Sequence, residues 1–114
     1  MWNSVAALSR YKVTSFLFRG YWADVGTVAS FYEANLMLAS PEPQFSFYEA
    51  SRPIYTHARF LPGSRLHNCR IDDTIVADGC TLDGCQVTNS VIGIRSQVQE
   101  GTTIRRSVIL GADY

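Results

Sequence analysis

The sequence predicts a mainly β fold, a parallel β-helix over residues 66–109, because this stretch repeats itself. When the copies that begin at Leu66 and Leu82 are aligned, aliphatic residues match aliphatic residues, cysteine matches cysteine and hydroxyl residues match hydroxyl residues. A third copy begins at Val98 and has one extra residue after the corner at Gly101. The aliphatic anchors of the three copies recur every five or six residues: Leu66, Ile71, Val76, Leu82, Val87, Ile92, Val98, Ile104 and Ile109.

This spacing is too long for a coiled-coil seam and too regular for a meander of hairpins. It is typical of a chain wound into coils of short flat strands, with one inward aliphatic side chain per strand and turns at Asp, Asn and Gly. Successive coils would stack as parallel strands about 4.8 Å apart and bury one another's apolar face. The alternative is a β-sandwich, but sandwiches alternate with period two and lack such a self-match. The spacing leaves the handedness open.

The composition describes a small globular chain without a marked charge. The 114 residues are 46% hydrophobic, which is sufficient for a core, and the formal net charge is zero. A neutral chain argues against a general nucleic-acid binder. No apolar window is long enough to span a membrane, and the first residues lack the basic start of a signal peptide. The odd number of cysteines, three without a CxxC motif, indicates a reducing compartment.

Cys69, Cys80 and Cys85 could form a metal site together with His67. The alternative is favoured, because Cys69 and Cys85 occupy equivalent places on adjacent coils, where a small apolar side chain fits. A buried free cysteine behaves as a small hydrophobic residue. We therefore expect the cysteines to belong to the core.

Before the repeat, the sequence predicts a strand and a helix. Residues 11–18 are rich in β-branched and aromatic residues and predict a strand, although no partner strand precedes them; residues 2–9 could form a short helix. Residues 28–39 predict a helix, with Thr27 as its N-cap and Ser40-Pro41 ending it. The expected apolar face of this helix consists of Val28, Phe31, Tyr32, Asn35 and Leu38.

Asp24 lies just before this helix, between aromatic residues and glycines. A helix N-terminus favours anions, Gly26 permits a close backbone approach, and Trp22 could pack on a sugar ring. A carboxylate beside a phosphate requires a divalent cation, and Mg²⁺ commonly binds one or two carboxylates plus substrate phosphates. Alternatively, Asp24 only helps to cap the helix after a tight turn.

The span 50–71 contains no acidic residue but four arginines and two histidines, Arg52, Arg59, Arg65, Arg70, His57 and His67. Arginine outnumbers lysine nine to one, and its planar fork suits phosphate and carboxylate groups. One interpretation is a small-anion site at the entry to the β-helix. The other is a solvated surface of unrelated arginines.

Seven segments together resemble the glucose-1-phosphate adenylyltransferase (ADP-glucose pyrophosphorylase) family, in order and spacing, from about residue 8 to the end. The first alone is similar to sugar-nucleotide pyrophosphorylases broadly, and the later ones narrow the resemblance to the ADP-glucose enzymes of the cyanobacterial and plant type. The segments are Gly-Tyr-Trp-Ala-Asp-Val-Gly-Thr at 20–27, Ser-Phe-Tyr-Glu-Ala-Asn at 30–35, Pro-Ile-Tyr-Thr at 53–56, Phe-Leu-Pro at 60–62, Asn-Cys-Arg at 68–70, Gly-Ile-Arg-Ser at 93–96 and Gly-Ala-Asp-Tyr at 111–114.

The resemblance implies an enzyme with a Rossmann-like domain that binds ATP and glucose 1-phosphate, followed by a left-handed β-helix. It makes ADP-glucose and pyrophosphate for glycogen or starch synthesis. On this basis residues 1–39 are the end of the catalytic domain, 40–59 a linker and 60–114 an incomplete β-helix. The expected location is the cytoplasm of a bacterium or the plastid of a plant.

By the same resemblance, Asp24 falls on the carboxylate that binds catalytic Mg²⁺ and Trp22 on an aromatic residue of the sugar-phosphate pocket. Arg59 falls on an arginine that binds an anionic allosteric effector or phosphate, with Arg52 as a weaker candidate from the charge pattern. His57 and Ala23 depart from common family residues, so an effector role for His57 is in doubt. The resemblance also implies a homo-oligomer, a tetramer in the family.

The family's Gly-rich nucleotide loop, second metal-binding Asp and sugar-phosphate Glu-Lys pair are not found in these residues. We therefore expect a C-terminal piece of the enzyme, inactive by itself. A non-catalytic oligomerisation or effector-binding module is the alternative. A hexapeptide acyltransferase is less favoured, because His67 is the only histidine of the repeat.

Overall fold

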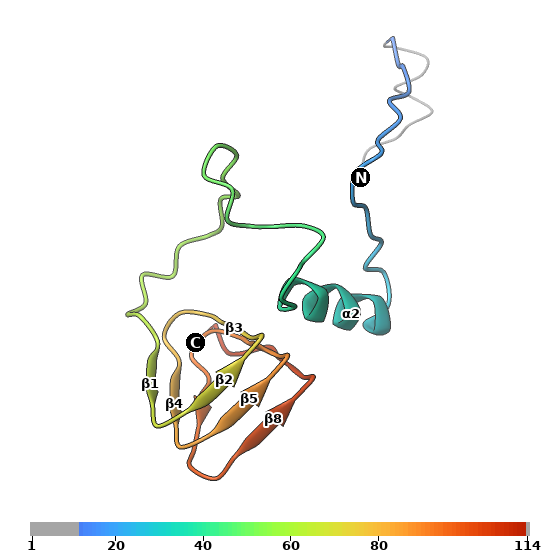
Figure 1. Ribbon diagram of the computed structural model, residues 1–114. Helices are drawn as coiled ribbons and strands as arrows, with labels where there is room; N and C mark the ends of the chain where they lie inside the picture. The colour runs from blue at the N-terminus through green and yellow to red at the C-terminus, as the bar shows by residue number, and fades with distance from the viewer. Residues whose placement is uncertain (1–11, 114) are drawn as a thin grey trace.

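The computed structural model describes residues 12–113, in which one helix is followed by nine short strands (Figure 1). The helix expected at 2–9 lies outside the described residues. The elements are α2 (Val28–Leu38), β1 (Arg65–His67), β2 (Arg70–Asp72), β3 (Ile75–Val76), β4 (Thr81–Asp83), β5 (Gln86–Thr88), β6 (Val91–Ile92), β7 (Gln97–Val98), β8 (Thr103–Arg105) and β9 (Val108–Ile109).

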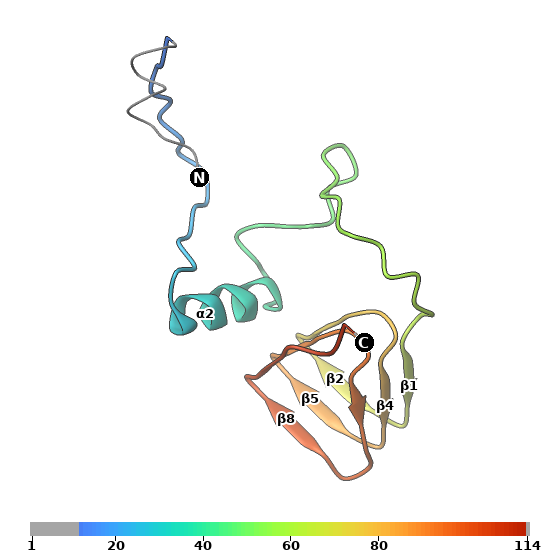
Figure 2. The ribbon, with the colours of Figure 1, turned by 180° about the vertical axis from the view of Figure 1, so that it is seen from behind.

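The nine strands form a parallel β-helix of three stacked coils. Each coil contributes one strand to each of three parallel sheets, ordered β1-β4-β7, β2-β5-β8 and β3-β6-β9. Figures 1 and 2 show from opposite sides how β2, β5 and β8 lie side by side while the chain turns at the corners between sheets. The β-helix predicted from the repeat is confirmed, and a β-sandwich is excluded.

The register between coils reproduces the self-match of the sequence. Leu82 pairs with Leu66, and Val87 pairs with Ile71, in two of the three sheets that join the first and second coils. In the third coil Val98 pairs with Leu82, but Thr103 pairs with Gln86, so the extra residue lies between Val98 and Thr103. The corner at Gly101 therefore absorbs the insertion without shifting any inward side chain.

The corners between the sheets each contain a residue with positive φ. Asp, Asn and Gly were expected there, because these residues adopt the left-handed region at least cost. Arg95 (φ 57°) and Arg106 (φ 46°) were not expected, and both stand where another coil has Gly or Asn. The corner residues are Asn68, Asp73, Gly79, Gly84, Asn89, Arg95, Gly101, Arg106 and Gly111.

The core of the β-helix is centred on its middle coil. Leu82, Val87 and Ile92 are fully buried, because a coil covers them on each side. The end coils are less protected, with Leu66 51% and Ile109 37% exposed. Burial thus depends on coil stacking rather than on any single strand.

Hydroxyl side chains inside the corners satisfy buried backbone groups. The fully buried Ser90 donates its hydroxyl to the Thr88 carbonyl at 2.9 Å and accepts the Ser107 amide at 3.1 Å. At another corner, the Ser64 hydroxyl accepts the Cys80 amide at 3.1 Å. The matched hydroxyls of the repeat therefore tie one coil to the next, and buried polar groups are stable when paired in this way.

Helix α2 is confirmed with Thr27 as its N-cap. The Thr27 hydroxyl accepts the Ser30 amide at 3.1 Å, and the Ser30 hydroxyl accepts the Thr27 amide at 3.1 Å, which completes a capping box. The expected apolar face is only partly correct. Val28 is 86% exposed, whereas Leu36 and Ala39 are buried, because α2 packs against β9.

The strand predicted at 11–18 is wrong for residues 12–18, which contain no strand. A strand needs a neighbour for its backbone hydrogen bonds, and Figures 1 and 2 show this segment extending away from α2 and the coils. Residues 41–60 contain neither helix nor strand and are all exposed. The division at residues 39 and 59 stays a prediction. Among residues 12–113, no helix is long and apolar enough to cross a membrane.

Candidate functional site

Asp24 lies in the tight turn that leads into α2. Its carboxylate oxygen Oδ1 accepts the Gly26 amide at 3.0 Å, and the side chain is exposed. A side chain at position 26 would begin 3.2 Å from the same oxygen, so glycine keeps the carboxylate uncrowded. Because Thr27 caps the helix, Asp24 stabilises the preceding turn and not the first helical turn.

The described residues offer Asp24 as a single oxygen ligand for a metal ion. Within residues 12–113 no group of three His, Cys, Asp or Glu side chains gathers closely enough to hold one. Mg²⁺ does not need such a cage, since it commonly keeps water and binds one or two carboxylates plus substrate phosphates. Asp24 therefore fits Mg²⁺ as one of several ligands. Mg²⁺ binding stays a prediction.

Trp22 borders a shallow apolar hollow of about 310 Å³ between the turn and α2. Trp22 is 76% exposed, so its indole ring is accessible to a ligand. Met37 of α2 and Phe45 of the following loop line the same hollow. Asp24 does not line it, so the structure places the two predicted substrate residues on the same turn but not in one shared pocket.

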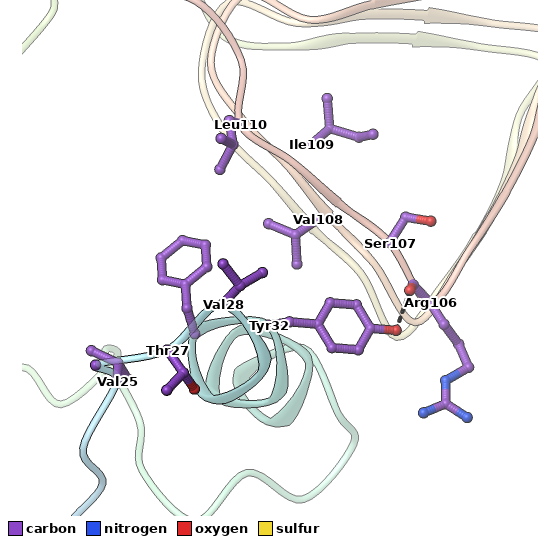
Figure 3. Close-up of a pocket in the computed structure, with 11 residues that line it drawn as sticks. Val25, Thr27, Val28, Tyr32, Arg106, Ser107, Val108, Ile109 and Leu110 are labelled. Carbon is purple, nitrogen blue, oxygen red and sulfur yellow. Dashed lines mark hydrogen bonds between the residues drawn. The ribbon is translucent and has the colours of Figure 1, made fainter.

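A second hollow, of about 830 Å³, separates the start of α2 from the strand β9 (Figure 3). Val28 lies on the helix side, and Val108 and Leu110 lie on the side of the coil. The Tyr32 hydroxyl donates to the Arg106 carbonyl at 2.5 Å and closes one end. The Arg106 guanidinium points away from the hollow in Figure 3, so its lining is mainly apolar. Sequence reasoning missed it, because its two walls lie far apart in the chain.

Arg59, the main anion candidate, lies where the linker meets the coils. Its Nε donates to Asp113 Oδ1 at 3.0 Å and its Nη1 to the His57 carbonyl at 2.7 Å. It borders a hollow of about 370 Å³ that Thr56 and Asp78 also line. Two of its donor nitrogens are thus held within the chain, so an anion there has to compete with Asp113.

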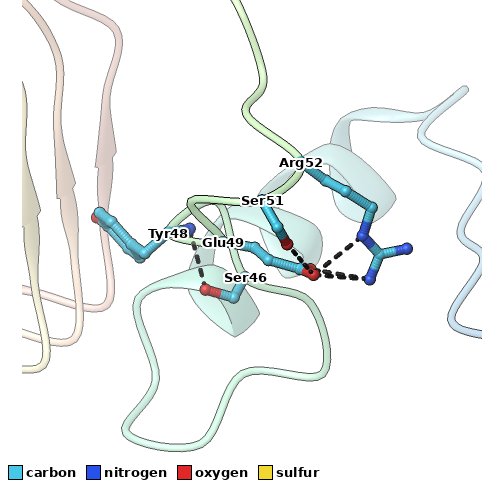
Figure 4. A network of polar contacts seen from close by, with 5 residues as sticks. All are labelled: Ser46, Tyr48, Glu49, Ser51 and Arg52. Atoms are coloured by element: carbon cyan, nitrogen blue, oxygen red, sulfur yellow. Dashed lines mark hydrogen bonds and ion pairs between the residues drawn. The ribbon is translucent and has the colours of Figure 1, made fainter.

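Arg52 forms a separate network in the exposed loop (Figure 4). Its Nε and Nη2 donate to the two carboxylate oxygens of Glu49, each at 2.9 Å. The Arg52 guanidinium, helped by the Ser51 hydroxyl, holds the pKa of Glu49 below its ordinary value. Arg52 and Arg59 line different hollows, so the structure does not bring the two candidates together.

The other basic residues of the span 50–71 are spread over the coil. Arg65 lies on β1 and Arg70 on β2, in two different sheets. His67 pairs with Asp83 of the next coil, Nδ1 to Oδ1 at 2.9 Å. The acid-free span is therefore not one cluster of positive charge, and Arg59 borders its hollow with His57 while Arg52 borders another.

The cysteines pack inside the β-helix as expected. Cys80 and Cys85 are buried and Cys69 is half-buried; all three are free. The Cys69 and Cys85 sulfur atoms lie 3.4 Å apart, and burial raises the pKa of the Cys85 thiol to about 11. His67 faces Asp83 instead of the sulfur atoms, which argues against a metal site formed with it.

Comparison with known proteins agrees with this architecture. Residues 59–114 match the family model of the GLGC left-handed parallel β-helix domain. Over 109 residues, or 96% of its length, the chain is 47% identical to the glucose-1-phosphate adenylyltransferase large subunit 2 of Hordeum vulgare. Residues 59–114 form a left-handed β-helix domain of the GLGC type, and the chain as a whole is similar to glucose-1-phosphate adenylyltransferase.

The match to this family model supplies the handedness that the repeat spacing left open: the coils wind to the left. The matched range begins at residue 59, next to the predicted domain start at residue 60. The chain spans about 60% of the length of the barley subunit.

Proposed function

We propose that the protein to which this chain belongs transfers an adenylyl group from ATP to glucose 1-phosphate, giving ADP-glucose and pyrophosphate for glycogen or starch synthesis. The observation that carries this proposal is the 47% identity to a protein named for that activity. Because the chain spans about 60% of that relative, the activity is proposed for the whole protein and not for these residues alone.

Adenylyl transfer depends on positioning and on neutralisation of charge. A phosphate oxygen of glucose 1-phosphate attacks the α-phosphorus of ATP in line with the departing pyrophosphate. We propose that Asp24 provides one carboxylate oxygen to Mg²⁺, which when bound offsets the negative charge of the phosphates. The exposed indole ring of Trp22 would pack on the sugar.

Residues 1–114 alone should not catalyse this reaction. Asp24 is the only carboxylate of its turn, and these residues carry no Gly-rich nucleotide loop. A hydrated Mg²⁺ held by one carboxylate binds weakly without bound phosphates. Pyrophosphate release by the purified chain, at a rate that disappears in Asp24→Asn, would contradict this expectation.

The test of the proposed function is Asp24→Asn in the whole protein. We expect kcat to fall by about 10²-fold or more, since a neutral amide replaces the anionic ligand, while the circular dichroism spectrum stays unchanged. Asp72→Asn is the matched control, because Asp72 is exposed on β2, away from the turn. Near-normal turnover of Asp24→Asn at saturating Mg²⁺ would show that Asp24 is not a ligand of the metal ion.

We also propose that Arg59 binds phosphate or an anionic effector, with Arg52 as the weaker candidate. Both arginines border a hollow, but Arg59 donates to one carboxylate oxygen, of Asp113, whereas Arg52 is engaged by both oxygens of Glu49. Phosphate added at constant ionic strength should raise the melting temperature through linkage. Arg59→Ala should blunt the increase, and the exposed Arg70→Ala should not. An equal rise in melting temperature in the two variants would show that Arg59 does not bind phosphate.

The whole protein is further proposed to be a homo-oligomer, in the cytoplasm of a bacterium or in a plant plastid. The exposed apolar groups at the coil ends, Leu66, Ile109 and Leu110, support association. They equally fit the alternative of a non-catalytic oligomerisation or effector-binding module. Light scattering combined with the kinetic assay separates the two: an oligomer without turnover would favour the module.

A further inference from the structure

Two free cysteines face each other across the first and second coils of the β-helix. Cys69 lies in the corner between β1 and β2, and Cys85 lies in the equivalent corner between β4 and β5. Their sulfur atoms are 3.4 Å apart, and the residues are sixteen positions apart in sequence. A disulfide needs about 2.05 Å, so the sulfur atoms would have to approach by only about 1.4 Å.

The backbone around the two cysteines suits a disulfide. His67 and Asp83 pair in register on one side of the corner, and Arg70 and Gln86 pair on the other. Parallel neighbours in register lie about 4.8 Å apart, within the roughly 4.4–6.8 Å that separates the Cα atoms of a disulfide. The spacing of the two coils therefore permits a disulfide between equivalent positions.

The two thiols differ in their access to an oxidant. Cys69 is half-buried in the first coil, whereas Cys85 is 2% exposed in the middle coil. Burial also raises the pKa of Cys85 to about 11, so this thiol stays protonated near neutral pH and reacts slowly with an oxidant by itself. Cys69 is the thiol that meets the oxidant first.

We propose that Cys69 and Cys85 form a reversible disulfide that fastens the first coil to the second when a peroxide is present. The Cys69 thiolate attacks hydrogen peroxide, the O–O bond breaks, and a sulfenic acid and hydroxide form. The Cys85 sulfur then attacks the Cys69 sulfur, the S–O bond breaks and the Cys85 proton leaves with the departing hydroxide as water. Both thiols are oxidised, the peroxide is reduced to water, and an added dithiol reverses the bond.

Cys80 provides a control within the same fold. It is as buried as Cys85, but its corner neighbours along the stack are Ser64 and Ser96. Its sulfur lies 3.1 Å from the Gly93 carbonyl oxygen and has no stacked thiol to react with. Burial alone therefore does not make a cysteine of this chain a candidate.

The disulfide should stabilise the end of the β-helix that is least protected. The first coil has one neighbouring coil, and its inward Leu66 is half exposed. A cross-link between residues sixteen apart removes conformational freedom from the unfolded chain. We expect the melting temperature to rise by several degrees, on the order of 5 °C, and the amides of β1 and β2 to exchange more slowly.

The test is peroxide treatment of the purified 114-residue chain, followed by intact mass spectrometry and peptide mapping. We expect a loss of about 2 Da that dithiothreitol reverses, a linked Cys69–Cys85 peptide pair, and the rise in melting temperature. Cys80→Ser should keep all three results, and Cys69→Ser should lose them. Cys85→Ser should also lose them; if it does not fold, Cys69→Ser alone decides.

Three outcomes would overturn the proposal. One is that the folded chain keeps its reduced mass after peroxide treatment. Another is a disulfide between two copies through Cys69, seen as a dimer on a non-reducing gel. The third is oxidation of Cys69 to the sulfinic acid without linkage to Cys85.

Discussion

The coils at residues 65–109 and the segment at residues 12–60 differ in how far their apolar side chains are buried. In the coils, Leu82, Val87 and Ile92 are fully buried, because each strand lies beside its equivalent one coil away. In residues 12–60, by contrast, Phe16, Trp22 and many other large apolar side chains are exposed, although α2 packs against β9.

The difference shows what a repeat contributes to a short chain. Every coil packs its apolar side chains against the next coil, so the contacts that stabilise a coil come from residues close to it in sequence. The turn with Asp24 and the strand-like residues 12–18 have no such neighbour in the described part of the chain. Exposed apolar patches of this kind mark interaction surfaces.

The largest expected effect comes from removing one inward side chain of the middle coil. Leu82→Ala should lower the free energy of unfolding by about 2–5 kcal/mol, through lost burial and the cavity left between three coils. Urea unfolding followed by circular dichroism measures the change. Phe16→Ala, at a position that is 86% exposed, should change it by less than about 0.5 kcal/mol. Equal effects of the two variants would contradict the contrast between the regions.

A smaller effect is expected at Gly93, where two coils approach closely. A side chain at Gly93 would begin 2.4 Å from the Leu110 carbonyl oxygen, which is backbone and has little room to move. Gly93→Ala should therefore lower the free energy of unfolding by about 1–3 kcal/mol. Gly63→Ala is the matched control, since nothing lies within 4 Å of its added carbon atom. Similar unfolding midpoints for the two variants would argue against close coil stacking at Gly93.

The smallest effect should come from the helix cap. Thr27→Ala removes the hydroxyl that accepts the Ser30 amide and should destabilise α2 by about 1 kcal/mol. Because α2 lies outside the coils, amide exchange should quicken in its first turn and stay unchanged in β5. A matching acceleration in β5 would show that helix and coils unfold together.

The coils could be predicted from the sequence because each coil repeats the residue pattern of the coil before it. The alignment of Leu66 with Leu82 predicted which strands pair. The extra residue near Gly101 lies where the register between the second and third coils changes from sixteen residues to seventeen. The positive φ at Arg95 could not be predicted, because its side chain does not favour that conformation and its Nη1 bond to the Ala112 carbonyl depends on the folded coil.

The candidate site was less predictable, because it depends on residues that are distant in sequence. Thr27 and Asp24 act through neighbours two or three residues away, and a local pattern indicated both. Arg59 is held by Asp113, far along the chain, so its ion pair was not expected. The strand at 12–18 was wrong for the same physical reason, since β propensity does not supply the partner that a strand requires.

Amide hydrogen exchange with mass spectrometry on the 114-residue chain tests the contrast between the two regions most directly. We expect the amides of β4 and β5 to be the slowest, because their strands have a hydrogen-bonded neighbour on each side. Residues 12–25 and 41–60 should exchange within seconds, since they form neither helix nor strand. Protection of residues 12–25 equal to that of β5 would contradict the account, because it would require a partner surface that the coils do not provide.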